Sequence, residues 1–473
     1  MKEDFIAYDN LRVTQYDIKH ITEVKIENDV NKHAKLILTG IVDDSVAASC
    51  VEDTDDETVI TVYYEKDDDT FVLFNGLVTN IKTTADNYVY SICIEAHSLT
   101  YVMDINKVKR DFQNTSMTTH ELIDHVMKPY KGAVYDINIP NEPIGQYILQ
   151  YNETDYEFLK RIVSKYHMGV ISAMELEHIH VYFGTPEVPV NPSLEINNYT
   201  ISKAVEEFND IKANDFEGAA ETDFITYKIR TDEIFNVGEN FNIEGQKYYV
   251  KKVSFDMKEA SFNNVYELRP KGGLIQKRLY DMNLIGISIA GSIAEVQRDR
   301  VKINLDGIDS VSGASYWFPY STVAASPDGG GWYCMPEVGE RIRMNCPTKD
   351  EGEAYVVNAI EGSDGNGNER MSNPDNKSLQ ASGQEVNFTP NGVNLSCCGG
   401  QASMNLNKDG TIDISGQNNI TISCGSSLNL RSEKEINISA QGGIKINCDS
   451  GSNLELTEGD EVMVKGTKDR NNG

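Results

Sequence analysis

The sequence predicts a mainly β protein of several domains that ends in a trimeric β-helical needle. Pairs of apolar residues recur at a fixed step from 404 to 464. Short segments rich in Val, Ile, Tyr and Thr fill the first hundred residues, and about five short strands crowd into 281–363. Helical periodicity is confined to one stretch, 109–185. A chain of 473 residues is long enough for three or four such domains.

Residues 1–108 are expected to form a first β-barrel unit. The segments Ala34–Val42, Thr58–Tyr64, Phe71–Ile81 and Tyr88–Ala96 are β-rich and end at polar turns. β-Branched and aromatic residues between turn residues are typical of strands.

Residues 109–185 are expected to form a small α/β insert. Thr118 with Glu121, and Thr154 with Glu157, have the spacing of a capping box. Each box precedes apolar residues at helical spacing, so each predicts a helix N-terminus.

The β pattern returns after the insert. It predicts a second β-barrel unit over 186–280 and, over 281–363, a small closed barrel of the oligonucleotide/oligosaccharide-binding (OB) type. Residues 364–385 are polar and carry Gly, Asn and Ser, which predicts a linker.

Residues 386–465 are predicted to form the needle, followed by a polar tail at 466–473. Two apolar residues separated by one position lie on one side of a strand, because side chains alternate between faces. Successive pairs start eight residues apart, except for one ten-residue step after Ile444. A strand-and-turn repeat at constant step is typical of stacked β architectures.

A single chain barely stabilises such an octad. Ordering eight backbones costs roughly 8–16 kcal/mol. Burying two Ile or Leu side chains returns roughly 3–6 kcal/mol, and each hydrogen bond adds about 1 kcal/mol. Three chains that each supply one face of a prism would cover every octad, whereas an ordinary β-sandwich would need the spacing to be coincidental. The predicted needle core and trimer interface is Met404, Leu406, Ile412, Ile414, Ile420, Ile422, Leu428, Leu430, Ile436, Ile438, Ile444, Ile446, Leu454, Leu456, Val462 and Val464.

Composition limits the possible partners. The net charge of -30 disfavours nucleic acid, whose phosphates require clustered Lys and Arg. The eight cysteines form no C-x-x-C pair, and Cys424 and Cys448 are expected to be small buried residues of the needle. The N-terminus has no apolar signal segment, and no run of 18 apolar residues occurs.

No catalytic residue, metal ligand or cofactor is predicted. The sequence contains no HExxH, GxSxG or P-loop motif. His178 and His180 have a spacing that a metal could use, but no carboxylate or cysteine is fixed beside them by sequence, so surface histidines are expected.

Three features together resemble the VgrG spike and phage tail-hub proteins. Residues Gln150–Arg161 read QYNETDYEFLKR, which is similar to the Q-Y-x-E-S-D-x-x-F-x-x-R region of that family. Arg300–Ile303 (RVKI), Trp317 and Pro336–Ile342 (PEVGERI) resemble the barrel that follows the hub. The needle stands in the C-terminal place that the family gives it.

The resemblance implies the trimeric central spike of a contractile injection apparatus, such as a phage tail, a tailocin or a type VI secretion system. Its β-barrel units would form a hub that matches a hexameric, Hcp-like inner tube within a baseplate. The OB-like barrels would form a collar, and the needle would pierce the target cell envelope. Assembly would take place in the cytoplasm as part of a tail-like particle.

Departures from some relatives sharpen these expectations. The linker at 364–385 is too short for an inserted muramidase, and the tail at 466–473 is too short for an effector domain. The needle has no histidine for an iron-binding tip, so a separate PAAR-like tip protein is expected. The action would be mechanical rather than enzymatic. Two alternatives remain open, a β-solenoid adhesin or binding protein and a peptidoglycan-cleaving spike.

Overall fold

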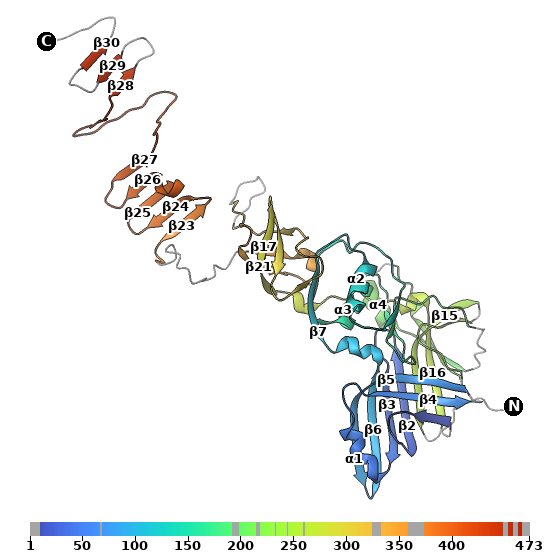
Figure 1. The fold of residues 1–473 in the computed structure, drawn as a ribbon. Coiled ribbons are helices and arrows are strands. Elements are labelled where there is room, and N and C mark those ends of the chain that lie inside the picture. The colour runs from blue at the N-terminus through green and yellow to red at the C-terminus, as the bar shows by residue number, and fades with distance from the viewer. Residues whose placement is uncertain are drawn as a thin grey trace. The chain divides into compact units, whose positions relative to one another are not determined.

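The computed structural model describes residues 10–66, 69–191, 198–213, 218–231, 233–243, 245–258, 261–323, 333–357, 373–447, 453–456 and 462–465. It divides into two compact units, Met1–Gly362 and Ser363–Gly473. Both are built mainly from strands (Figure 1), as the sequence predicts.

An 11-stranded sheet dominates the first unit. Its order is β1-β4-β5-β6-β3-β2-β15-β16-β13-β12, with β14 paired to β15. The strands are β1 (Leu11–Val13), β2 (His20–Asp29), β3 (Lys35–Val42), β4 (Val59–Lys66), β5 (Asp69–Asp86), β6 (Val89–Ser98), β12 (Tyr199–Lys203), β13 (Ile225–Arg230), β14 (Asn240–Ile243), β15 (Gln246–Lys258) and β16 (Ser261–Pro270).

The antiparallel pair β2–β15 joins the two parts of the chain predicted as separate β-barrel units. Its register runs from Lys252 opposite Asp29 to Lys258 opposite Glu23. Strands from 1–108 and from 186–280 therefore hydrogen-bond within one continuous sheet.

The core of this sheet follows from alternation along its strands. In β3, every second residue is buried, and Leu36 and Leu38 are completely inaccessible to solvent. Neighbouring β2 supplies Val24 and Ile26 to the same core. Side chains alternate across a sheet, so one apolar face per strand is enough to build this core.

Two helices of this unit were not predicted. They are α1 (Asp44–Glu52) and α4 (Val205–Ala213). The N-cap residue of α1, Asp43, is of a preferred type, but its side chain makes no capping hydrogen bond.

The α/β insert has both predicted capping boxes. Thr118 and Glu121 bond reciprocally at the start of α2, and Thr154 and Glu157 do so at α3. Helices α2 and α3 lie together beside β7 (Figure 1). The elements are β7 (Lys107–Phe112), α2 (Thr119–Met127), β8 (Val134–Ile137), β9 (Ile148–Thr154), α3 (Asp155–Ser164), β10 (Val170–Ser172) and β11 (His180–Phe183).

The predicted OB-like barrel is a five-stranded sheet of order β20-β18-β17-β21-β22. A bridge between Tyr320 and Val356 connects its two edges, which closes the sheet. Its core also receives Tyr147 and Leu149 from the insert. The strands are β17 (Ser288–Gln297), β18 (Arg300–Leu305), β20 (Phe318–Pro319), β21 (Arg341–Asn345) and β22 (Tyr355–Val357); β19 (Asp309–Ser310) instead pairs with β7.

Short 3-10 helices connect these strands. They span Leu99–Asp104, Glu221–Phe224, Lys271–Leu274, Met282–Leu284 and Glu351–Glu353 in the first unit and Cys398–Gly400 in the second.

The second unit contains two antiparallel meanders. The first comprises β23 (Lys377–Ala381), β24 (Gln384–Thr389), β25 (Gly392–Cys397), β26 (Ala402–Asn407) and β27 (Ile412–Gly416). The second comprises β28 (Ile444–Asn447), β29 (Asn453–Leu456) and β30 (Val462–Lys465). The first meander begins inside the predicted linker 364–385, and residues 417–443 carry neither strand nor helix. The tail at 466–473 lies outside the described residues.

Candidate functional site

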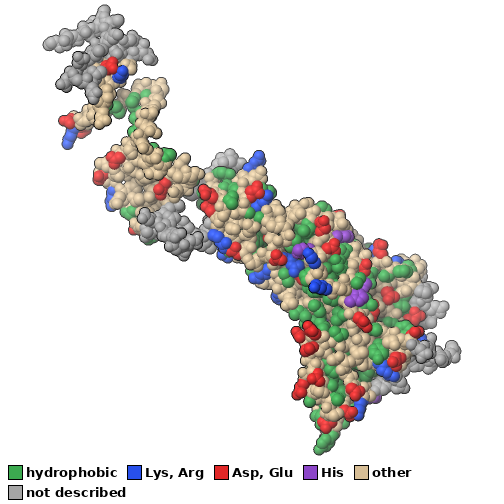
Figure 2. All heavy atoms as spheres, viewed as in Figure 1, with side chains coloured by type: hydrophobic (Ala, Val, Ile, Leu, Met, Phe, Trp, Pro, Cys, Tyr) green, Lys and Arg blue, Asp and Glu red, His purple; other side chains and the backbone are tan. Residues whose placement is uncertain are grey.

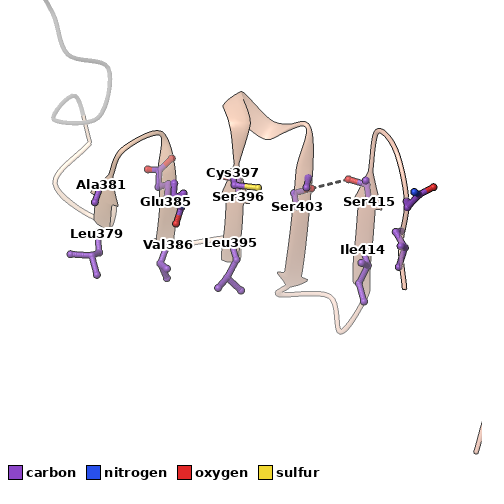
Figure 3. A pocket seen from close by; sticks show the side chains of 15 residues that line it. Leu379, Ala381, Glu385, Val386, Leu395, Ser396, Cys397, Ser403, Ile414 and Ser415 are labelled. Atoms are coloured by element: carbon purple, nitrogen blue, oxygen red, sulfur yellow. Dashed lines mark hydrogen bonds between the residues drawn. The ribbon is translucent and has the colours of Figure 1, made fainter. Parts of the chain in front are cut away.

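The first candidate site is a set of cross-strand apolar rows in the second unit, here named the apolar ladder. One row crosses the first meander through Leu379, Val386, Leu395, Met404 and Ile414, each opposite the next. Figure 3 shows Leu379, Val386, Leu395 and Ile414 in line across the strands of the meander. The antiparallel register places the apolar pairs opposite one another, although only the last step, from Met404 to Ile412, has eight residues.

A second row runs parallel to the first. Phe388 lies opposite Val393, Val393 opposite Leu406, and Leu406 opposite Ile412. The two rows give the first meander a continuous apolar stripe. An open groove of about 570 Å³ follows part of it (Figure 3).

Polar side chains that alternate with the apolar residues along β26 and β27 form hydrogen bonds with one another. The hydroxyls of Ser403 and Ser415 are 2.9 Å apart (Figure 3), and Asn407 Nδ2 donates to Asp413 Oδ2 at 2.7 Å. Because they alternate with ladder residues along β26 and β27, they lie on the opposite face. The meander therefore has one apolar and one hydrogen-bonded polar face.

The apolar ladder is exposed to solvent in the single chain. Its exposed members in the first meander range from 37% at Met404 to 62% at Ile412, while Val386 and Val393 are half-buried. Green hydrophobic atoms are accordingly visible on the surface of this unit in Figure 2. Exposed apolar residues at regular spacing indicate a surface that another molecule covers.

The structure brings together only some of the predicted needle residues. It pairs Met404 with Ile414, Leu406 with Ile412, Ile444 with Leu456, Ile446 with Leu454, Leu454 with Val464, and Leu456 with Val462. The other six, Ile420, Ile422, Leu428, Leu430, Ile436 and Ile438, lie in the strandless stretch and are all exposed. The side chains of Val462 and Val464 lie outside the description.

The needle cysteines also differ from expectation. Cys424 is exposed in the single chain rather than buried, because the stretch around it forms no sheet. Cys448 lies outside the described residues.

The second candidate site is the buried group of Glu153, Arg161 and Glu351, here named the junction cluster. Arg161 Nε and Nη2 donate to the Glu153 carboxylate at 2.9–3.2 Å, and Nη2 also donates to the carbonyl of Leu149 at 2.9 Å. Arg161 Nη1 pairs with Glu351 Oε1 at the far end of the guanidinium. One planar fork thus joins α3 and β9 of the insert to the OB-like barrel.

Burial sets the electrostatics of this cluster. Burial disfavours the charged guanidinium, but the carboxylates of Glu351 and Glu153 outweigh it and raise the pKa of Arg161. Burial also raises the pKa of Glu153, which Arg161 only partly offsets. Glu153 and Glu351 thus share one cation, Arg161, as their common partner.

A second buried ion pair extends the junction. Arg110 of β7 lies 3.2 Å from the carboxylate of Asp155, which also accepts a hydrogen bond from the Tyr130 hydroxyl at 2.8 Å. Gln150 donates to Asp155 Oδ1 at 2.9 Å. Four residues of the QYNETDYEFLKR segment are therefore structural members of the junction, namely Gln150, Glu153, Asp155 and Arg161.

Sequence reasoning did not identify Glu351 or Arg110 as members of this junction. Glu351 is 190 residues from Arg161, and no spacing signal connects positions that far apart. The only available signal was the polar motif itself, whose Glu153, Asp155 and Arg161 need partners if they are buried.

Of the two histidines, only His180 has a described contact with a carboxylate. His180 Nε2 lies 3.0 Å from Asp136 Oδ2, and the rings of His178 and His180 stack with centroids 6.1 Å apart. Within the described ranges, no group of three or more His, Cys, Asp or Glu residues could hold a metal ion. No helix in that part of the chain is both long and apolar enough to cross a bilayer.

A family model described as the phage tail baseplate hub (GPD) matches residues 57–192. This segment belongs to the phage tail baseplate hub family. It runs from β4 to β11 and contains the QYNETDYEFLKR motif, so the hub domain includes most of the junction cluster. By sequence, no curated protein matches the chain.

Solved structures extend the likeness beyond the hub segment. The Escherichia coli c3393 protein, described as a type VI secretion component similar to the T4 phage tail proteins gp27 and gp5, aligns with a TM-score of 0.56 at 10% identity. The alignment covers 74% of this chain and 99% of that one. The lidless Francisella PdpA-VgrG complex aligns with a TM-score of 0.53 at 10% identity, covering 84% and 93%. The chain therefore has the fold of the VgrG and tail-hub proteins.

Proposed function

We propose that three copies of this chain form the central spike of a contractile injection apparatus. The hub would join an Hcp-like hexameric inner tube and the baseplate, and the second unit would form the needle. The proposed action is mechanical, with no catalytic step. The family match of residues 57–192 and the fold of most of the chain support this assignment.

The main observation in support of a trimer is the exposed apolar ladder. Its residues have the alternation of a buried face, yet they remain open to water in one chain. Fully burying one Leu or Ile side chain contributes about 1.5–3 kcal/mol, so the repeat would be a large driving force for association. Three identical faces can cover one another around an axis, because each presents the same apolar stripe.

The strandless stretch supports the same assembly. Residues 417–443 keep the eight-residue spacing of apolar pairs, but no neighbouring segment in the described chain pairs with their backbone as a sheet. Backbone donors and acceptors need partners when a strand is buried. In the proposed spike, the other two chains would supply those partners.

The junction cluster suggests how force would pass from hub to collar. β7 of the hub pairs with β19 of the OB-like barrel, and Arg161 bonds to carboxylates on both sides. Hydrogen bonds and ion pairs that cross a boundary resist its separation. The same boundary would carry the thrust of the tube during contraction.

The needle end would take a further protein. We include a PAAR-like tip among the proposed partners, because the last strands of a prism leave unpaired edges. The target cell envelope is the structure that the spike would cross.

Light scattering after size exclusion tests this proposal on the full chain. Three chains of 52.8 kDa give a particle of about 158 kDa. That mass, unchanged on tenfold dilution, would support the spike. A monodisperse particle of 52.8 kDa would contradict it and favour a solenoid-type binding protein.

A further inference from the structure

A cavity of about 310 Å³ lies in the first unit, apart from both candidate sites. Strands β2, β10 and β11 line it together with the segments 186–191 and 236–239. A volume of this size is at the lower end of the range for small-ligand pockets. It also exceeds the volume of a single bound ion or water, since one water occupies about 30 Å³.

The wall between the two loop segments is tightly built. Gly238 has a φ of +92°, and a Cβ there would lie 2.6 Å from Cγ of Pro186. Only glycine allows this close approach without displacing the loop. The cavity is therefore a product of specific backbone packing.

The two carboxylates of the cavity, Glu175 and Glu239, are held in place by hydrogen bonds. Glu239 accepts from the backbone amide of Asn236 at 3.0 Å and from Asn191 Nδ2 at 2.7 Å. Glu175 accepts from the backbone amide of Met174 at 3.0 Å. Both acidic groups are thus oriented before any ligand arrives.

Asn28 adds an acceptor without a partner. It lines the cavity with only 2% of its surface exposed, and its Nδ2 donates to the carbonyl of Ser172 at 2.9 Å. Its Oδ1 has no hydrogen-bond partner within the part of the chain that the structure describes. Buried polar atoms normally have partners, so an unpaired acceptor in a cavity indicates a missing donor.

The lining has an excess of negative charge. Glu175 and Glu239 belong to it, and no Lys, Arg or His is among the described residues that form it. Burial, together with Asp136, Glu175 and Glu239, raises the pKa of Tyr182 in the wall. Ile171 and Val188 supply apolar surface between the polar groups.

We propose that this cavity binds an organic cation, an ammonium or guanidinium group at the end of a short aliphatic stem. The cation would donate hydrogen bonds to Glu175, Glu239 and the Asn28 Oδ1. The stem would pack against Ile171 and Val188. A Lys or Arg side chain of a partner protein and a small free amine share this chemistry, and neither depends on the proposed needle.

Calorimetric titration of the full chain tests the proposal. The probe is n-butylguanidinium, and 1-pentanol is the neutral control of similar length. The cation is expected to bind saturably, while the alcohol shows no binding.

Two variants assign the binding to the cavity. Glu175→Gln is expected to weaken binding of n-butylguanidinium at least tenfold, because it removes one of the two charges. Glu187→Gln alters an exposed carboxylate in the same loop, outside the lining, and should leave affinity unchanged. Glu239→Gln should weaken binding of n-butylguanidinium to a similar extent. If this variant fails to fold, the affinity of Glu175→Gln alone tests the proposal.

A blocked peptide, acetyl-Gly-Arg-Gly-amide, distinguishes the two sources of the cation. Tighter binding of the peptide than of n-butylguanidinium would assign the site to a partner's side chain. Exclusion of the peptide would assign it to a free small cation. Absence of saturable binding by both probes, or equal affinity in wild type and Glu175→Gln, would overturn the proposal.

Discussion

Strands β3 and β27 carry the same alternation of apolar and polar residues but differ in what covers the apolar side. In β3, Leu36 and Leu38 are completely buried by other strands of the same chain. In β27, Ile412 and Ile414 are 62% and 55% exposed. Alternation therefore specifies a face that must be covered, while the source of the cover depends on the rest of the molecule.

This difference separates two kinds of stability. The first unit contains large cores within one chain, so its unfolding should not depend on protein concentration. The apolar ladder has no such core, so its order should depend on association. The following substitutions test the two regions separately, beginning with the largest expected effect.

Replacing Ile436 and Ile438 together with Asp should abolish the proposed trimer. Six carboxylates would lie near the axis, at a cost of several kcal/mol for each. Light scattering would report the change in mass. Asn437→Asp places a charge on the opposite face of the same segment and should leave the mass unchanged. Retention of a trimer by the double variant would contradict the axis assignment.

Arg161→Met should destabilise the first unit by roughly 3–5 kcal/mol, because it leaves Glu153 and Glu351 buried without their cation. Urea unfolding of the full chain, monitored by the signal of a spectroscopic probe in the OB-like barrel, would measure this loss of stability. Lys160→Met, the adjacent position on α3, is the matched control and should cost far less. A loss below about 1 kcal/mol would exclude Arg161 as the main link between the α/β insert and the OB-like barrel.

Leu38→Ala should lower the free energy of unfolding of the large sheet by about 2–5 kcal/mol through loss of buried apolar surface. The particle mass should stay the same. Thr39→Ala, on the other side of β3, is the control. A change of oligomeric state in Leu38→Ala, without unfolding, would mean that the two regions are not independent.

Asp111→Asn should stabilise the first unit by about 1 kcal/mol at pH 7.5, because the buried Asp111 Oδ1 has no partner in the described chain. Burial raises the pKa of Asp111 above its ordinary 3.8. The charged form is therefore disfavoured in the folded state, and wild type loses stability as pH rises above that value. The advantage of the variant should disappear below pH 3.8.

Asp306→Asn provides a control of opposite sign for this pH profile. A hydrogen bond from Arg341 holds the pKa of Asp306 below its ordinary value, so the wild-type carboxylate stabilises the fold above pH 3.8 and loses this effect on acidification. The variant should be less stable than wild type at pH 7.5 and equal to it in acid. Parallel profiles for the two variants would contradict the burial argument for Asp111.

Local signals in the sequence predicted local structure. The capping boxes of Thr118 and Thr154 were found because each needs only residues three positions apart. The five-stranded sheet was found because several β-rich segments lie close together within 281–363. Helix α1 was missed because its N-cap residue, Asp43, is not followed by a Glu or Gln that would complete a capping box.

Contacts between distant positions could not be predicted in the same way. Arg161 and Glu351 meet only because α3 and the OB-like barrel are packed together. The cavity proposed to bind an organic cation is lined by Asn28 of β2 and by the loops around 188 and 238. In the first meander, the sequence named Met404, Leu406, Ile412 and Ile414 but none of the ladder residues before them. The trimer interface stays a prediction, since no residue of one chain can identify a partner copy.

Amide hydrogen exchange over residues 417–443 of the full chain tests the central proposal most directly. In the proposed trimer, the amides around Ile420, Leu428 and Ile436 would be hydrogen-bonded to other chains, and they should resist exchange for hours. The amides of β3 in the same sample serve as the internal reference for a covered strand. Exchange of 417–443 within seconds, while β3 stays protected, would show that no other chain pairs with this stretch and would contradict the proposed spike.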